Sequence, residues 1–239
     1  MIGCDCVTCR STDPRDKRWR PSVYVEMDDG NAVLVDAGPD IRAQALTFNV
    51  RRVDAIIFTH GHADHIMGLD DVRRFNAIQQ RAMPCYGDAA TLNDLRRTFF
   101  YAFDPSTPRG GGLPQLELFR IAGPFCLGRQ EIVPVPLFHG QRPILGLRIG
   151  PLAYLTDCNR IPDESWPLLE GLDLLVLDAL RETRHPTHFS LSEAVGVTRR
   201  IAPRRACFTH MCHNLRHADT CAKLPRGMEL AYDGLVVNL

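Results

Sequence analysis

Short runs in which apolar residues alternate with polar ones, or follow one another without a break, recur along the chain. Runs of this length bounded by turn residues predict β-strands. The predicted strands are Ser22–Met27, Ala32–Asp36, Asp54–Thr59, Leu116–Ile121, Glu131–Leu137, Leu145–Ile149, Leu152–Thr156, Asp173–Asp178, Ala206–Thr209 and Leu235–Asn238.

Segments with apolar residues at helical spacing lie between these strands. The predicted helices are Asp40–Phe48, Leu69–Arg81, Ala89–Tyr101, Pro162–Glu170, Ser190–Ile201 and Ala218–Leu224. Ser190 stands three residues before Glu193, which predicts a capping box at a helix start. Helices interspersed among strands favour a layered α/β architecture.

With 239 residues and 45% hydrophobic content, the chain is long enough for one large domain spanning residues 1–239. The longest interruption of the pattern is the Pro- and Gly-rich stretch 104–112. Three interpretations of this loop stay open: a mobile flap, a contact in a homodimer, and an ordinary surface loop.

The composition of the chain indicates where the protein works and what it can bind. No run approaches the roughly 18 apolar residues of a membrane span, and no export signal is visible, so we expect a soluble, cytoplasmic protein without a membrane partner. The formal net charge is +0, which argues against nucleic acid as a partner. Nine Cys is a high and odd number, which in a cytosolic protein favours thiols and metal ligands over disulfides.

The most informative chemistry is the hexapeptide His60-Gly61-His62-Ala63-Asp64-His65, which directly follows a predicted strand. Imidazole and carboxylate side chains are the ligands that suit zinc, manganese or iron. Further candidate ligands follow other predicted strands, namely His139, Asp157 and His210. Because strand ends at one edge of a sheet converge in space, we expect these seven residues to hold two ions.

A second metal motif opens the chain, where Cys4, Cys6 and Cys9 form C-x-C-x-x-C. Three thiolates at this spacing suit one tetrahedral zinc and require a fourth ligand. His213 is the preferred candidate because, three residues after His210, it can turn away from the other metals; Cys212 and His217 compete with it.

The His60–His65 sequence resembles the signature His-x-His-x-Asp-His of the metallo-β-lactamase superfamily. The resemblance implies a four-layer αββα sandwich. It also implies that His60, His62 and His139 bind one ion, that Asp64, His65 and His210 bind the second, and that Asp157 bridges them. Asp36 matches the family's Asp-x-Gly element, which supports the metal loop from outside the ligand shell.

Three further segments resemble one branch of that superfamily, the phosphoribosyl 1,2-cyclic phosphate phosphodiesterases. They are Gly3–Cys9 with the following Asp13–Arg15, then Pro186–Ser190, and Thr209–His213. The resemblance implies a structural zinc on Cys4, Cys6, Cys9 and His213, and catalysis involving His188 and Asp64. Such relatives begin with a further strand and a Gly-rich turn before the cysteines, whereas here Met1-Ile2-Gly3 opens the chain, which leaves an exposed sheet edge as an expectation.

The expected reaction is hydrolysis of a small phosphodiester such as a ribose cyclic phosphate. Attack comes from a hydroxide that bridges two divalent ions, zinc or manganese, and His188 gives a proton to the leaving oxygen. The basic stretch Arg15–Arg20 is interpreted either as a contact to a second substrate phosphate or as a solvated loop.

Three alternative functions stay open. An RNA-processing phosphodiesterase shares the metal motif and a similar His-containing loop, but neutral charge argues against it. A thioester hydrolase shares the hexapeptide but does not explain the cysteines or His188. A non-catalytic metal-binding accessory protein of cofactor biosynthesis is the third, because a fold alone does not establish turnover.

Overall fold

The structure is a computed structural model that describes residues 1–108, 110 and 112–239. Arg109 and Gly111 of the loop 104–112 lie outside the described residues, and the interpretations of that loop stay predictions. The chain divides into two compact units, one formed by residues 20–131 and the other by residues 1–19 together with 132–239. They are called here the β1–β5 unit and the β7–β12 unit. The prediction of a single domain stays a prediction.

The β1–β5 unit contains one mixed sheet in the order β1-β2-β3-β4-β5. Its strands are β1 (Val23–Glu26), β2 (Ala32–Val35), β3 (Ala55–Ile57), β4 (Met83–Gly87) and β5 (Leu116–Arg120). β1 pairs antiparallel with β2, and the pairs from β2 to β5 are parallel.

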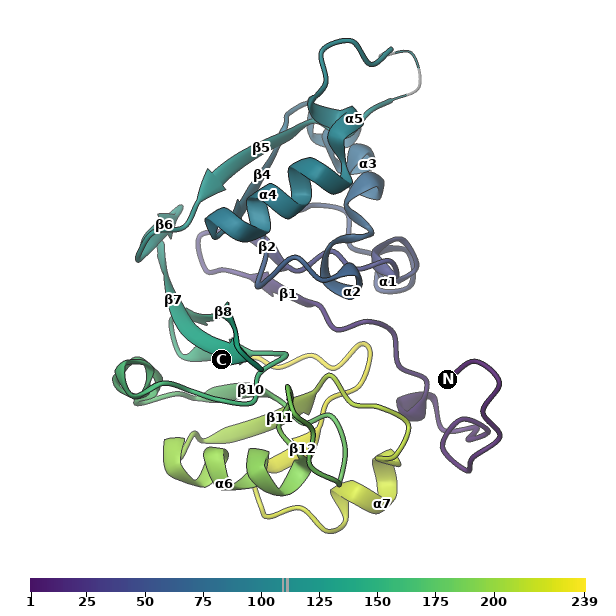
Figure 1. Cartoon of the computed structure of the whole chain (residues 1–239), viewed down its shortest axis with the longest axis vertical. Helices are drawn as coiled ribbons and strands as arrows, with labels where there is room; N and C mark the ends of the chain where they lie inside the picture. The colour runs from purple at the N-terminus through teal and green to yellow at the C-terminus, as the bar shows by residue number, and fades with distance from the viewer. Residues whose placement is uncertain (109, 111) are drawn as a thin grey trace. The chain divides into compact units, whose positions relative to one another are not determined.

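Helices accompany this sheet, and α4 lies against β4 and β5 (Figure 1). They are α1 (Ile41–Thr47), α2 (Ala63–Ile66), the 3₁₀ helix η2 (Leu69–Val72), α3 (Arg73–Gln79), α4 (Ala89–Thr98) and α5 (Phe100–Phe103). Leu34, Ile56, Phe58, Leu69 and Leu95 belong to one buried apolar cluster. Burial of these apolar side chains explains why the short strands and helices hold together.

The β7–β12 unit is built on a second mixed sheet, whose order is β12-β11-β10-β9-β8-β7-β6. The strands of this sheet are β7 (Gln130–His139), β8 (Arg142–Ile149), β9 (Leu152–Leu155), β10 (Leu174–Asp178), β11 (Arg205–Thr209) and β12 (Met228–Leu230). The sheet also includes β6 (Phe125–Leu127), whose residues fall in the range 20–131. β7, β8 and β9 pair antiparallel, whereas β9 to β12 pair parallel.

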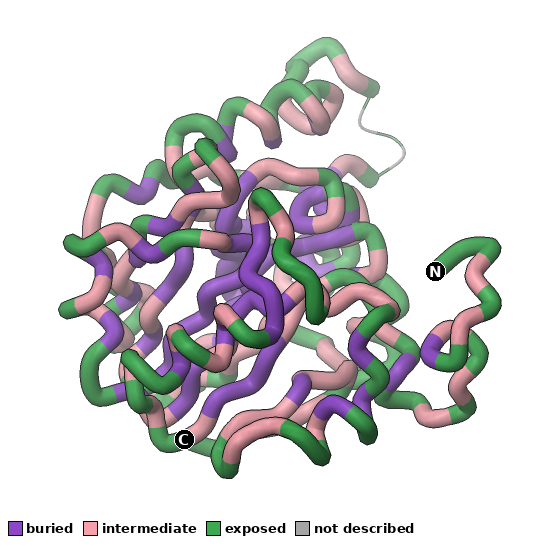
Figure 2. The backbone as a smooth tube through the Cα atoms, turned by 60° about the horizontal axis from the view of Figure 1, so that its bottom comes forward, coloured by how far each residue is buried: buried purple, intermediate pink, exposed green. Residues whose placement is uncertain are grey.

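The helices of this unit are η1 (Pro14–Asp16), the 3₁₀ helix η4 (Asp163–Leu169), α6 (Leu191–Ile201) and α7 (His217–Cys221). α6 lies against β10, and α7 lies beside β12 (Figure 1). The predicted capping box is present, with the Ser190 side chain and Glu193 satisfying each other's backbone N–H groups. Buried residues, purple in Figure 2, include Leu155, Leu177 and Phe208 of the central strands.

One strand prediction and one helix prediction are wrong. Leu235–Asn238 is not a strand, because this apolar run has no partner strand and Val236 is 79% exposed. Pro162–Glu170 forms a 3₁₀ helix rather than an α-helix, since Pro167 inside it lacks the N–H that an α-helical turn requires.

Several short elements escaped prediction. β4 was missed because Pro84 and Gly87 weaken its strand pattern, although its residues alternate in burial. β6 and β12 have three residues each, too few for a periodic signal. Among the described residues no helix is long and apolar enough to cross a membrane.

The direction of the strands positions the candidate site residues. Parallel neighbours end at the same sheet edge. In the β1–β5 unit, Asp36 follows β2, and His60 comes three residues after β3. In the β7–β12 unit, Asp157 follows β9 by two residues, and His210 directly follows β11. His139 ends β7, which runs parallel to β9 because two antiparallel steps separate them.

Candidate metal centre

The predicted donors are divided between the two units, four in one and three in the other. In the β1–β5 unit, His60 and His62 lie on the loop between β3 and α2, and His65 lies within α2. The ring centroid of His60 is 4.5 Å from that of His62 and 4.3 Å from that of His65. Asp64 is in the first turn of α2, and its Oδ2 lies 3.7 Å from Nε2 of His65. The hexapeptide therefore forms a compact group of nitrogen and oxygen donors.

Asp36 orients this group through hydrogen bonds to Thr59 and His65. Its fully buried carboxylate accepts hydrogen bonds from the Thr59 backbone N–H (2.9 Å), the Thr59 hydroxyl (2.8 Å) and Nδ1 of His65 (2.8 Å). A His65 ring that donates from Nδ1 carries its lone pair on Nε2, which is the form that binds a metal. Asp36 has a φ of 64°, a left-handed conformation that Asp adopts more readily than most residues.

The Asp36-Ala37-Gly38 segment also holds the metal loop through its backbone. The Ala37 N–H donates to the His65 carbonyl at 2.8 Å, and the Gly68 N–H donates to the Ala37 carbonyl at 2.9 Å. A Cβ atom added to Gly38 would lie 2.2 Å from the Asp64 carbonyl oxygen. Only glycine permits this approach of the two backbones.

In the β7–β12 unit, the donors His139, Asp157 and His210 come from the ends of three strands. Nε2 of His210 lies 3.3 Å from Oδ2 of Asp157. Nδ1 of His139 donates to the Thr187 carbonyl at 2.8 Å, which again leaves the lone pair on Nε2. Burial lowers the pKa of His139, which favours the neutral imidazole that a metal requires.

A buried carboxylate that sequence reasoning missed, Asp178, joins two histidines of this unit. Its Oδ1 lies 3.1 Å from Nδ1 of His188 and 3.5 Å from Nδ1 of His210, and its Oδ2 accepts the Phe189 N–H at 2.9 Å. The His188 and His210 rings stack with centroids 4.8 Å apart, and the His139 ring contacts His188 edge-on at 4.6 Å. Burial raises the pKa of Asp178 well above its usual range, so a nearby positive charge would favour ionisation of this carboxyl.

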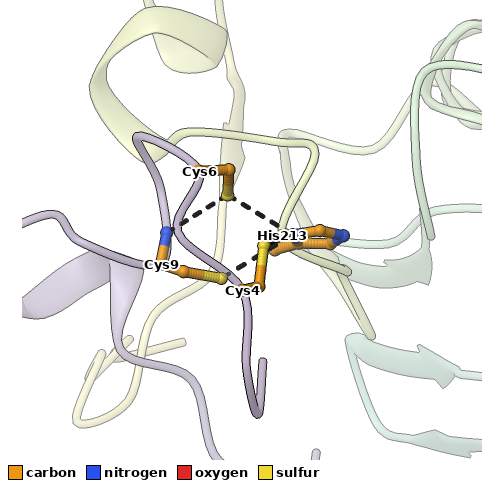
Figure 3. A group of neighbouring side chains, drawn as sticks. All are labelled: Cys4, Cys6, Cys9 and His213. Carbon is orange, nitrogen blue, oxygen red and sulfur yellow. Dashed lines mark hydrogen bonds between the residues drawn. The ribbon is translucent and has the colours of Figure 1, made fainter.

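The third group of donors consists of Cys4, Cys6 and Cys9 near the start of the chain and His213 near its end (Figure 3). Nδ1 of His213 is 3.3, 3.4 and 3.6 Å from the Sγ atoms of Cys4, Cys6 and Cys9. Sulfur and nitrogen ligands of a tetrahedral zinc are separated by about 3.6 Å, so the four side chains fit one zinc ion. We call this group the cysteine knuckle.

The electrostatics and the neighbours of the knuckle agree with this fit. The Cys9 backbone N–H, followed by the His213 ring, lowers the pKa of Cys6 to about 6, which favours the thiolate that binds zinc. The competing ligand candidates point elsewhere. Sγ of Cys212 lies 2.9 Å from the Asn214 side-chain oxygen, and His217 is buried beside Cys221, with 3.7 Å between Nε2 and Sγ.

Arg18 of the basic stretch has a structural role. Its guanidinium donates to the Cys212 carbonyl at 3.0 Å and to the Leu215 carbonyl at 2.5 Å, and it lies 3.5 Å from the carboxylate of Asp16. Asp16 in turn accepts the His217 N–H at 2.7 Å. These contacts hold the segment after the knuckle against residues 212–217. The guanidinium of Arg18 therefore binds groups of the protein itself.

Comparison with known proteins places these observations in a family. Residues 31–211 match the family model described as a beta-lactamase superfamily domain. The solved structure entitled a new diphosphatase from the PhnP family is 44% identical, with a TM-score of 0.91, and the match covers 98% of this chain and 89% of that one. The chain belongs to the β-lactamase superfamily and, within it, to the PhnP family.

Two curated relatives match this PhnP-family chain less completely. An octanoyltransferase from Porphyromonas gingivalis is 34% identical over 98% of this chain, which spans only 48% of that protein. A ribonuclease Z from Aeropyrum pernix is 36% identical over 31% of this chain and 24% of its own length. The chain thus spans about half, or less, of these curated relatives. The predicted metallo-β-lactamase-type α/β fold is confirmed, and the chain forms a metal-dependent hydrolase domain.

The sequence analysis of this PhnP-family domain named the candidate donors and the supporting residue Asp36, but it missed Asp178 and the contacts of Thr59 and the Thr187 carbonyl. Asp178 stands at the end of a predicted strand, the same signal that identified Asp157 and His210, and could have been found by it. Thr59 and the Thr187 carbonyl gave no sequence signal, since their roles depend on which side chains reach them. The assignment of metals to these residues stays a prediction, and so does the role of His188.

Proposed function

We propose that the protein hydrolyses a small phosphodiester such as a ribose cyclic phosphate. His188 carries this proposal, because it is a buried imidazole set among the predicted donors His139 and His210 and held by Asp178. With Nδ1 directed to Asp178, a protonated His188 carries its second proton on Nε2. That proton is the one it gives to the leaving oxygen of the ester.

The proposal also assigns the seven predicted donors to two divalent ions. His60, His62 and His139 would hold one divalent ion, Asp64, His65 and His210 would hold the second, and Asp157 would be a ligand shared by the two sets. Zinc or manganese suits this donor set. Two such ions supply an activated water and polarise a phosphoryl oxygen. The cysteine knuckle holds a separate structural zinc. In the same proposal, the substrate is a small molecule, and the protein binds neither a membrane nor nucleic acid.

Replacement of His188 by Ala tests its role. Loss of general acid help typically costs about 10²–10⁴-fold in rate for a substrate with a poor leaving group. The variant is therefore compared on a ribose cyclic phosphate, which leaves an alkoxide, and on bis-p-nitrophenyl phosphate, whose leaving group needs no proton. We expect a large loss of kcat on the first substrate and a small loss on the second, with unchanged metal content. Equal losses on both would show that His188 is not the proton donor.

Diphosphate hydrolysis is a second candidate function, because the 44% identical relative is named a diphosphatase. An assay on ADP-ribose, a diphosphate diester, compares it directly with the cyclic phosphate. A thioester substrate is included to test the thioesterase alternative. A pre-tRNA substrate tests RNA processing, which the ribonuclease Z match over 31% of the chain supports only in part. An absence of turnover on all four substrates would favour the non-catalytic accessory function.

A further inference from the structure

The side chain of Asn159 joins two segments of the β7–β12 unit, the turn after His139 and the loop that carries His188. Its oxygen accepts the Gly140 N–H at 2.9 Å, and its NH₂ group donates to the Pro186 carbonyl at 2.9 Å. A backbone N–H can only donate and a carbonyl can only accept, so these partners fix which end of the amide faces which segment. Gly140 directly follows His139, and Pro186 stands two residues before His188. One half-buried side chain therefore contacts both segments.

We propose that Asn159 is a positioning residue that holds the His139 turn and the His188 loop in a fixed mutual arrangement, and so sets the place of the imidazole that gives the proton. The inference rests on the proposed function, because it takes His188 as the proton donor and His139 as a metal ligand. It adds to that function a residue outside the predicted donor set, which acts through the backbone of the two segments.

The turn and the loop also contact each other beside Asn159. Nδ1 of His139 donates to the Thr187 carbonyl at 2.8 Å. Gly140 has a φ of 64°, and a Cβ atom added to it would lie 2.9 Å from Cγ2 of Thr187. Glycine suits this position, because it adopts the left-handed conformation without strain and leaves room for the threonine. The turn therefore packs directly on the residue before His188, and the Asn159 amide ties the same two segments together.

The residue after His188 is held as well, in part by the neighbour of Asn159. The Phe189 N–H lies 2.9 Å from the Cys158 carbonyl and 2.9 Å from Oδ2 of Asp178, so the two acceptors share it. Backbone groups at positions 186, 187 and 189 are thus all held, and the contact at position 186 depends on the Asn159 side chain. A proton donor must lie within hydrogen-bond reach of the leaving oxygen. Loosening of position 186 should therefore reduce the rate of proton transfer.

Trypsin digestion of the metal-free protein measures how firmly the loop is held, without an assay of activity. Arg181 and Arg184 provide cleavage positions in this loop, and the Arg184 side chain is 88% exposed. Asn159→Asp keeps an acceptor for the Gly140 N–H but places an oxygen against the Pro186 carbonyl, so it releases the loop alone, whereas Asn159→Ala releases both segments. We expect cleavage after residues 181 and 184 to be about threefold to tenfold faster in both variants, the factor that one hydrogen bond contributes.

Kinetics on two substrates then test whether this placement serves proton transfer. A ribose cyclic phosphate leaves an alkoxide that needs a proton, whereas bis-p-nitrophenyl phosphate does not. Asn159→Asp should lower kcat on the first substrate about tenfold or more and kcat on the second by no more than about twofold. Asn76→Ala is the matched control, since Asn76 accepts the Gln115 N–H at 2.9 Å and donates to the Arg81 carbonyl at 2.9 Å within the β1–β5 unit. It should leave the ratio of the two kcat values unchanged.

Unchanged digestion of both Asn159 variants would overturn the positioning role. Faster digestion together with equal changes of kcat on the two substrates would also overturn it and leave the proposed function intact. If the wild-type protein hydrolyses neither substrate, the proposed function fails, and digestion of the metal-free protein then decides whether Asn159 holds the loop. Cleavage after residues 181 and 184 that is faster in both Asn159 variants than in Asn76→Ala would support this role, and equal cleavage would refute it.

Discussion

Replacement of Asp36 by Asn is the most direct test of how the metal loop is organised. The change preserves size and shape, and Asn tolerates the φ of 64° that position 36 requires. It exchanges one carboxylate oxygen for an NH₂ group, which then faces Nδ1 of His65. Two donors cannot share a hydrogen bond, so His65 must move its hydrogen to Nε2 and lose the lone pair directed to the metal.

The expected magnitudes follow from the three hydrogen bonds of Asp36. Loss of a partner that orients a ligand typically weakens metal binding about 10–100-fold, or about 1.4–2.8 kcal/mol. The metal-free protein should lose only about 1 kcal/mol of unfolding free energy, because Asn still accepts the Thr59 N–H and donates to the altered His65. Asp36→Asn thus separates metal affinity from stability.

Metal affinity is measured by competition with a chelator, and unfolding free energy by urea titration of the metal-free protein. Asp29→Asn serves as the control, since Asp29 lies in the same unit and accepts two backbone N–H bonds, from Arg129 at 2.7 Å and Asn31 at 3.0 Å. Asp36→Asn with wild-type metal affinity would refute the orienting role. A parallel loss in the control would mean that the effect is not specific to His65.

Two further predictions concern the N-terminal segment. Arg18→Met should lower the unfolding free energy, measured in urea, by about 3 kcal/mol, because it leaves the buried carboxylate of Asp16 without its positive partner. The control Arg15→Met, at an exposed arginine, should change the unfolding free energy little. Similar small effects of both substitutions would contradict the structural role of Arg18. Cys6→Ser should remove one equivalent of zinc and lower the Tm, whereas Ser at the exposed Cys126 should do neither, as metal analysis and calorimetry can show. Full zinc content in Cys6→Ser would rule out its ligand role.

The candidate donors could be predicted from the strand pattern because each apolar run forms a strand, and the polar residue after the run lies at the edge of the sheet. Apolar runs such as Asp54–Thr59 and Ala206–Thr209 became buried parallel strands, and the polar residue after each run then lies at the sheet edge. The rule needs only the period of the strand and the place where it ends. It therefore works for His60, Asp157 and His210.

The contacts that support the site did not follow from the strand pattern: Asp36 was named through the family resemblance, and Asp178 was missed although it ends a predicted strand. Asp36 contacts Thr59 and His65 from more than twenty residues away in sequence, and Asp178 meets His188 across a loop. Such contacts depend on the tertiary arrangement, which no local period encodes. Arg18 illustrates the reverse case. Its basic stretch was interpreted either as a phosphate contact or as a solvated loop, whereas its guanidinium donates to two backbone carbonyls.

The cysteine knuckle has a consequence for the order in which the chain folds. Cys9 and His213 are separated by 204 residues in sequence. At about 5–20 residues per second of synthesis, a nascent chain carries Cys4, Cys6 and Cys9 for about 10–40 s before the ribosome adds His213. The fourth ligand of the proposed zinc site is therefore added only after nearly all strands have been made. Cys4, Cys6 and Cys9 are therefore synthesised long before their fourth partner, and until then their sulfur atoms stay open to oxidants.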